Sequence, residues 1–219
     1  MGPSRYFPPV EAADEDGLLA VGGQLTIPWL LDAYSHGIFP WPAPGYPLLW
    51  FSPEPRAIIE LDALHVSRRL ERTLRSGKFE ISYNGDFAEV MRGCATAVGR
   101  GRGGGTWITP AMRQAYQRLH ELGHAHSVEA WHEGALAGGV YGVALGAAFF
   151  AESMFYAVRD ASKVALVHLV RRLRSRGYQL LDIQQLTPHT QRLGAIEIPR
   201  QEYLRRLEAA LGQSVTFID

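Results

Sequence analysis

Apolar and polar positions repeat with different periods along the chain, and each period predicts an element. After Thr109, the apolar residues Met112, Tyr116 and Leu119 recur at helical spacing until Gly123. Threonine is a favoured N-cap and glycine a common helix terminator, so this stretch predicts a helix that begins after Thr109.

Three strand-like runs follow this helix. They span residues 126–131, 136–145 and 147–150, and they are separated by Glu133-Gly134 and by Gly146. Short apolar runs joined by turn-forming residues are typical of antiparallel hairpins. We therefore predict a three-stranded meander.

The next periodic stretch returns to helical spacing. Leu166, Leu169, Val170 and Leu173 form one apolar stripe after a capping residue at 160 or 162, and a strand at 178–184 follows at once. A meander, a helix and a further strand is the core order of the acyltransferase fold of acetyl-CoA users. The sequence thus predicts an α+β protein whose larger domain has a mixed, acyltransferase-like (GNAT-like) sheet.

The first 62 residues have a different texture. Prolines and aromatic residues are dense there, which leaves room for short strands and for a helix near residues 29–34, whereas a basic helical pattern begins near residue 64. We predict a small N-terminal α/β domain over residues 1–62 and the larger, GNAT-like domain over residues 63–219. The run 99–105, GRGRGGG, predicts a mobile loop.

Composition restricts the class of protein. The 219 residues are 47% hydrophobic and 20% charged with a formal net charge of zero, which is ordinary for a globular protein and excludes a uniformly basic one. A single cysteine, Cys94, excludes an internal disulfide and fits a reducing compartment. No apolar run is long enough to span a membrane, so we expect a cytoplasmic protein.

Three polar residues are candidates for chemistry. Asp182 and Gln184 lie two positions apart on a predicted strand, so their side chains share a face and can orient a nucleophilic amine. Glu152 follows two phenylalanines, and its carboxylate would gain from a cationic ligand. The alternatives are a solvated strand end for the pair, and a salt bridge from Glu152 to Arg159 or Lys163.

Other side chains predict binding surfaces less specifically. The chain has many large apolar side chains, which either pack a core or line a cavity for a bulky apolar group. They are Trp41, Trp50, Phe51, Trp107, Phe149, Phe150 and Met154. Two clusters of basic residues either contact phosphates or form solvated helix faces. They are Arg68, Arg69, Arg72, Arg75 and Lys78, and Arg171, Arg172, Arg174 and Arg176. The closely spaced His124, His126 and His132 have no carboxylate or thiolate at ligand spacing, so we expect no metal site.

Several longer runs carry a resemblance to a known family. In order, GLLAVGGQL, GIFPW, LLWFSPEPR, TWIT, AYQRLHELGHAHSVEAW, GGVYGV, ESMF, ASKVAL, LLDIQ and LGAIEIPR resemble the leucyl/phenylalanyl-tRNA–protein transferases from Phe7 to about Leu207. The match departs from the usual family pattern at Gln24, Phe51 and Ile183, in the QQLTPH run, and in the longer GRGRGGG run.

The resemblance implies an enzyme that transfers Leu, Phe or sometimes Met from aminoacyl-tRNA to proteins beginning with Arg or Lys, which marks them for degradation. It implies no cofactor, and with it we expect a monomer. Asp182 and Gln184 would lie at the reaction centre and Glu152 would hold the acceptor. A hydrophobic substrate pocket would use Trp50, Trp107, Phe149, Met154 and Leu169.

Two other functions compete with this one. A CoA-dependent N-acyltransferase would need a glycine-rich turn before the helix near residue 161, but that junction reads FYAVRDASKVAL and has no glycine. A non-catalytic RNA-binding module could use the arginine clusters, and would bind RNA regardless of aminoacylation.

Overall fold

The computed structural model describes residues 2–42, 45–97 and 108–218. The predicted loop at 99–105 and Trp107 lie outside these residues. In chain order the helices and strands are η1 (Val10–Ala12), β1 (Leu18–Val21), α1 (Ile27–Ser35), β2 (Phe39–Pro40), β3 (Leu49–Phe51), β4 (Arg56–Ile59), α2 (Arg68–Arg75), β5 (Glu80–Tyr83), α3 (Phe87–Thr96), α4 (Pro110–Glu121), β6 (Ala125–His132), β7 (Ala135–Leu145), β8 (Ala148–Tyr156), α5 (Ala161–Ser175), β9 (Leu180–Gln184), α6 (Pro188–Gln191), β10 (Ala195–Ile198) and α7 (Arg200–Leu211).

The strands of the described residues form two sheets. A small antiparallel sheet has the order β1-β3-β2, and a seven-stranded sheet has the order β10-β4-β9-β8-β7-β6-β5. In the larger sheet β8 and β9 are parallel and the other neighbours are antiparallel. The chain is thus α+β with a small N-terminal sheet before a larger mixed sheet, as the sequence predicts.

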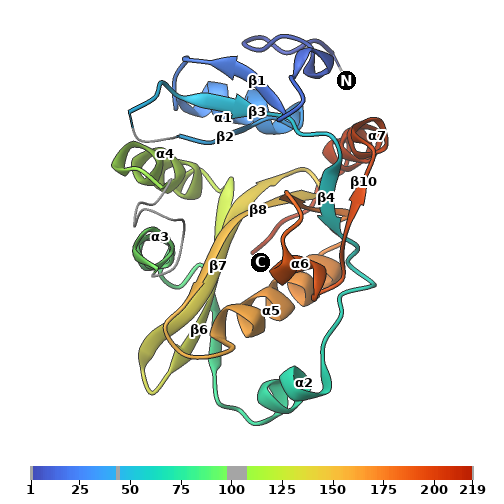
Figure 1. Cartoon of the computed structure of the whole chain (residues 1–219). Coiled ribbons are helices and arrows are strands. Elements are labelled where there is room, and N and C mark those ends of the chain that lie inside the picture. Colours follow the sequence, from blue (N-terminus) through green and yellow to red (C-terminus); the bar gives the residue numbers. More distant parts are fainter. Residues whose placement is uncertain (1, 43–44, 98–107, 219) are drawn as a thin grey trace.

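Helices cover both faces of the larger sheet (Figure 1). The helices α3 and α4 lie on one face, while α5, with α2 and α6 near it, lies on the other. One hydrophobic cluster joins α1, α3 and α4 to the sheet, and a second joins α5 to it. The small sheet sits beside α4 and the end of β8, which brings α1 close to one end of the large sheet.

Local patterns predict several of the elements correctly. Thr109 caps α4 through its side chain, and Met112, Tyr116 and Leu119 are fully buried. The meander β6-β7-β8 is present, with Glu133 and Gly134 both at positive φ in its first turn. The crossover α5 and the parallel strand β9 complete the acyltransferase-like element order.

The pairing of β4 bears on the predicted domain boundary at residue 62. The strand β4 precedes residue 62 yet pairs with β9 and β10 in the larger sheet, so that sheet uses residues from both sides of this position. The boundary at residue 62 itself stays a prediction. None of the described helices has the length and apolar character needed to cross a membrane.

Candidate active site

Two neighbouring strands position the central pair of polar side chains. In the parallel register of β8 and β9, Phe150 lies opposite Asp182. Two residues further along each strand, Glu152 and Gln184 therefore come together. The Gln184 Nε2 donates a hydrogen bond of 2.7 Å to the Glu152 Oε1, so predicted residues from two distant segments meet in one site.

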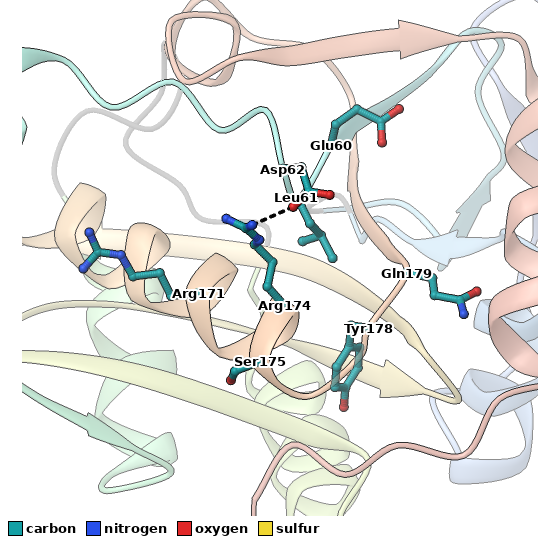
Figure 2. A pocket seen from close by; sticks show the side chains of 8 residues that line it. All are labelled: Glu60, Leu61, Asp62, Arg171, Arg174, Ser175, Tyr178 and Gln179. Carbon is teal, nitrogen blue, oxygen red and sulfur yellow. Dashed lines mark ion pairs between the residues drawn. The ribbon is translucent and has the colours of Figure 1, made fainter.

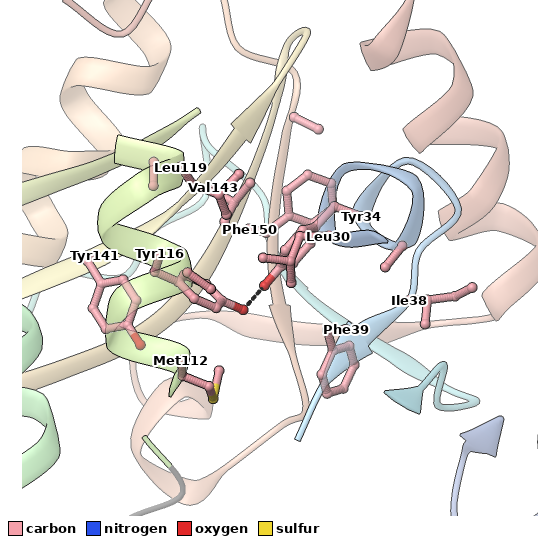
Figure 3. Packing of buried hydrophobic residues seen from close by; sticks show 14 of the residues in the cluster. Leu30, Tyr34, Ile38, Phe39, Met112, Tyr116, Leu119, Tyr141, Val143 and Phe150 are labelled. Carbon is pink, nitrogen blue, oxygen red and sulfur yellow. Dashed lines mark hydrogen bonds between the residues drawn. The ribbon is translucent and has the colours of Figure 1, made fainter. Parts of the chain in front are cut away.

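Glu152 is a buried carboxylate surrounded by donors. Its Oε1 also accepts a hydrogen bond of 2.8 Å from the Tyr34 hydroxyl, and its Oε2 accepts one of 3.2 Å from the Tyr116 hydroxyl. The two tyrosine hydroxyl oxygens also lie within hydrogen-bond distance of each other, and Figure 3 shows them facing across the space between α1 and α4. Neither Arg159 nor Lys163 pairs with Glu152 in this network, which removes the salt-bridge alternative.

Burial dominates the titration of this group. It raises the pKa of Glu152 from 4.5 to about 7, because the three hydrogen bonds do not outweigh the loss of water, and the nearby Asp182 charge adds to the rise. Burial together with the Glu152 charge also raises the pKa values of Tyr34 and Tyr116 well above 10, so both hydroxyls remain donors. A cation reaching Glu152 would stabilise its ionised form.

Asp182 lies in a second, more deeply buried network. Its carboxylate pairs with Arg56, with distances of 3.0 Å from Nε to Oδ1 and 2.6 Å from Nη2 to Oδ2. The Tyr203 hydroxyl donates a further hydrogen bond of 2.8 Å to Oδ2. Burial opposes the charge on Arg56, but Asp182 beside it raises the pKa of the guanidinium above its ordinary value. Asp182 has no exposed surface, so it is not the solvated strand end of the alternative interpretation.

Gln184 connects the two networks. Its backbone N–H donates a hydrogen bond of 2.8 Å to the Asp182 Oδ1, while its side chain reaches Glu152. Its φ of 66° is left-handed, a conformation uncommon for residues other than glycine. This backbone turn ends the strand alternation, so Asp182 and Gln184 do not project side by side: one side chain faces Arg56 and the other faces Glu152.

A cavity of about 250 Å³ opens at Glu152 and Gln184. Its lining is mainly apolar with several polar residues, and consists of Trp41, Ile59, Val140, Ala151, Glu152, Ser153, Met154, Leu166, Ile183, Gln184, Gln185, Thr187, His189 and Thr190. An apolar enclosure with a few convergent polar groups is the usual form of a small-molecule site. The arrangement can hold an apolar group while a cationic or amine group contacts the carboxylate and the amide.

The predicted substrate-binding residues are only partly brought to this cavity. Met154 lines it. Trp50 is fully buried in the small sheet beside Phe7, its indole donating to the Gly22 carbonyl, and it does not line the cavity. Phe149 and Leu169 are buried in the cluster beneath α5 and do not line it either. Trp107 lies outside the described residues.

Four residues of the site are not singled out by the sequence pattern. Arg56 and Tyr203 hold Asp182, and Tyr34 and Tyr116 hold Glu152. The pattern assigns Tyr116 only to the apolar stripe of a helix, although its hydroxyl is the part that reaches the site. Among the described residues, no group of three or more His, Cys, Asp or Glu side chains is arranged to hold a metal ion.

Comparisons with known proteins point to one family. The family model described as leucyl/phenylalanyl-tRNA protein transferase matches residues 58–208, and the model of the N-terminal domain of the same proteins matches residues 23–54. The chain is 56% identical over 207 residues to the leucyl/phenylalanyl-tRNA–protein transferase of Nitratidesulfovibrio vulgaris, covering 94% of this chain and 88% of that protein.

Similarity extends to other organisms and, more weakly, to solved structures. The protein of the same name from Azoarcus sp. is 53% identical over 204 residues, covering 92% of this chain and 86% of that one. The solved structure of L-PGS from Bacillus licheniformis is similar with a TM-score of 0.41 and 12% identity, over 82% of this chain and 60% of that chain.

Proposed function

The chain belongs to the leucyl/phenylalanyl-tRNA protein transferase family, and from that membership we propose that it transfers leucine or phenylalanine from aminoacyl-tRNA to the N-terminus of proteins beginning with Arg or Lys. The observation that supports a site for this reaction is that Glu152 and Gln184 are hydrogen-bonded to each other in the lining of a mainly apolar cavity. The apolar wall suits a leucyl or phenylalanyl side chain, and the carboxylate suits a cationic acceptor.

The reaction needs little beyond positioning. The acceptor's neutral α-amine attacks the carbonyl carbon of the aminoacyl ester, a carbon–nitrogen bond forms, and the bond from that carbon to the ribose oxygen then breaks. One proton leaves the nitrogen and one arrives on the ribose oxygen, so the products are an amide and a free tRNA hydroxyl. Holding the two reactants in contact supplies most of the acceleration available to such a reaction.

We assign separate roles to the three central residues. Glu152 attracts the acceptor's positive charge, and the amide of Gln184 orients the attacking amine. Asp182 is a positioning residue: with its carboxylate held by Arg56 and Tyr203, it fixes the backbone of Gln184 through the hydrogen bond to the Gln184 N–H. This replaces the direct role that the strand pattern suggests for Asp182.

The finer consequences are part of the same proposal. The product would be a degradation signal on the acceptor protein, and methionine would be a further donor. The enzyme would act as a cytoplasmic monomer without a cofactor, and the buried single cysteine Cys94 is compatible with a reducing compartment.

A transfer assay tests the proposal. The purified protein is mixed with radiolabelled Leu-tRNA or Phe-tRNA and a model protein beginning with Arg, without ATP or CoA, and label in acid-stable protein is measured. The matched acceptor differs only in beginning with Ser. We expect incorporation into the Arg protein alone. No incorporation by folded enzyme, or incorporation that requires CoA, would contradict the proposed function.

A further inference from the structure

Glu152 has hydrogen-bonding capacity that the fold leaves unused. A carboxylate accepts about four hydrogen bonds, about two at each oxygen. The Oε1 of Glu152 receives two, from the Tyr34 hydroxyl and the Gln184 amide, whereas its Oε2 receives one, from the Tyr116 hydroxyl. Within the part of the chain that the structure describes, Oε2 therefore keeps room for a further donor.

The carboxylate also fixes which end of the Gln184 amide is free. A carboxylate only accepts hydrogen bonds, so the amide NH2 group faces Glu152, at 2.7 Å, and the carbonyl oxygen Oε1 is at the other end. None of the described residues donates to this oxygen. Both side chains line the cavity of about 250 Å³. The Glu152 Oε2 and the Gln184 Oε1, which we call the nucleophile site, can thus accept both hydrogens of an amine or of a water molecule.

Charged and titratable groups surround Glu152 or share its cavity. They are Tyr34 of α1, Arg56 of β4, Tyr116 of α4, Asp182 of β9 and His189 of α6. The pKa values of both tyrosines lie well above 10, and Asp182 is held by Arg56 and does not line the cavity. Burial is the main cause that lowers the pKa of His189, so this side chain is uncharged near neutral pH. Among the described residues that line the cavity, Glu152 is the one carboxylate.

Two carboxylates in another cavity lack this arrangement. The cavity of about 730 Å³ in Figure 2 is lined by Glu60, Asp62 and Arg174, among other residues. Asp62 is paired with Arg174 at 2.8 Å, and Glu60 is paired with Arg206 at 2.6 Å. A nucleophile would have to displace a guanidinium to reach either carboxylate, whereas Glu152 has an oxygen with room for it.

We propose that Glu152 takes a proton from whatever nucleophile occupies this site, and that water held there makes the protein an aminoacyl-tRNA hydrolase when no acceptor protein is bound. This rests on the proposed function, because the aminoacyl ester must occupy the cavity. A water molecule takes up about 30 Å³ and needs two or more polar partners, which the nucleophile site supplies.

The hydrolysis balances without any further reactant. The water oxygen bonds to the carbonyl carbon of the aminoacyl ester, and the bond from that carbon to the ribose oxygen breaks. One proton passes from the water to Glu152 and from there to the ribose oxygen. The products are the free amino acid and a tRNA with a free hydroxyl, and Glu152 is again ionised.

Release of leucine without any acceptor protein tests this activity. Leu-tRNA with radiolabelled leucine is incubated with excess enzyme, and acid-soluble label is followed against a sample without enzyme. We expect release above that background from the wild type. Glu152→Gln keeps the size of the side chain but cannot take the proton, so enzyme-dependent release should fall about a hundredfold. Glu121→Gln, at an exposed glutamate of α4 paired with Arg118, is the matched control and should release leucine like the wild type.

The pH profile separates proton transfer from a structural effect. Burial raises the pKa of Glu152 to about 7, so enzyme-dependent release should rise about tenfold for each pH unit below 7 and level off above it. Tyr116→Phe removes a donor that stabilises the ionised carboxylate, so the midpoint of the profile should move up by about one pH unit, the size of one hydrogen bond to a charged group. Because both proteins act on the same substrate, titration of the substrate cancels in this comparison.

The outcomes are distinguishable. A preparation that transfers leucine to protein but releases none without an acceptor would overturn the hydrolase and leave the proposed function standing. Release by Glu152→Gln at the wild-type rate, or a Tyr116→Phe profile with an unmoved midpoint, would also overturn it. Release that depends on Glu152, from a protein that transfers leucine to no acceptor, would instead overturn the proposed function and support the hydrolase.

Discussion

Replacing Glu152 with glutamine should change how the stability of the protein depends on pH. The pKa of Glu152 rises from 4.5 in an ordinary setting to about 7 in the fold. Between these two pH values the folded protein holds a proton that the unfolded chain has released, so the free energy of unfolding falls as the pH rises. One pH unit corresponds to about 1.4 kcal/mol, so Glu152 alone should cost about 3 kcal/mol of stability from pH 4.5 to 7.

Glu152→Gln removes this titration and keeps the size of the side chain. Urea unfolding at half-unit steps from about pH 4 to 8 gives the free energy of unfolding of both proteins, and their difference isolates residue 152. The variant should gain about 3 kcal/mol relative to the wild type between pH 4.5 and 7, and the difference should be flat above about pH 8. Parallel curves across this window would refute the assignment of a raised pKa to Glu152.

Three further predictions concern other parts of the molecule. Arg56→Met leaves the Asp182 carboxylate buried without its cation and should lower the free energy of unfolding by about 4 kcal/mol, as read from urea unfolding at neutral pH; a loss below about 1 kcal/mol would contradict the buried pair. Burial and the nearby histidines lower the pKa of His126 from 6.5 to about 4, so His126 titrates in the opposite sense to Glu152. Its contribution to the free energy of unfolding is complete above pH 6.5 and is lost as the pH falls towards 4, so His126→Gln should reduce the loss of stability in acid by about 3 kcal/mol. An unchanged loss of stability in acid would contradict the lowered pKa. Val140→Phe fills part of the 250 Å³ cavity and should raise the KM for Phe-tRNA about tenfold or more in steady-state transfer, and an unchanged KM would show that the aminoacyl side chain binds elsewhere.

Local periodicity predicts four strands of the larger sheet, the meander β6-β7-β8 and the strand β9, and it misses β4, β5 and β10. The stripe after Thr109 and the first two runs of the meander depend on neighbours in the sequence, and these elements form close to where the pattern places them. The third run is predicted to end at residue 150, but β8 continues to Tyr156 and includes Glu152. The pattern cannot show that Arg56 begins a strand of the same sheet, because its pairing partners lie on strands near the other end of the chain. Pairing over such a distance leaves no periodic signal.

The sequence predicts the centre of the site and misses its surroundings. Glu152 is singled out because it follows two phenylalanines, and Gln184 because it lies two positions after Asp182 on a predicted strand. The structure brings Glu152 and Gln184 within a hydrogen bond. Tyr34 and Tyr116 have the pattern of core residues, since a ring buries its face whether or not its hydroxyl contacts a site. The large aromatic Trp50 is expected in the pocket for the same reason, and it is a core residue of the small sheet.

The most direct test of the account is the transfer rate of Gln184→Asn. Asparagine keeps an amide and accepts the left-handed backbone of residue 184, but it withdraws the amide by one methylene from Glu152 and from the cavity. A displacement of that size at a positioning group costs about a hundredfold in rate. We predict that single-turnover transfer of leucine from Leu-tRNA to an Arg-initiated protein falls about a hundredfold. The protein should still unfold in one cooperative urea transition, with its free energy of unfolding lowered by about 1 to 2 kcal/mol because the buried hydrogen bond to Glu152 is lost. Full transfer activity in a correctly folded Gln184→Asn protein would contradict the claim that the reaction takes place at Glu152 and Gln184.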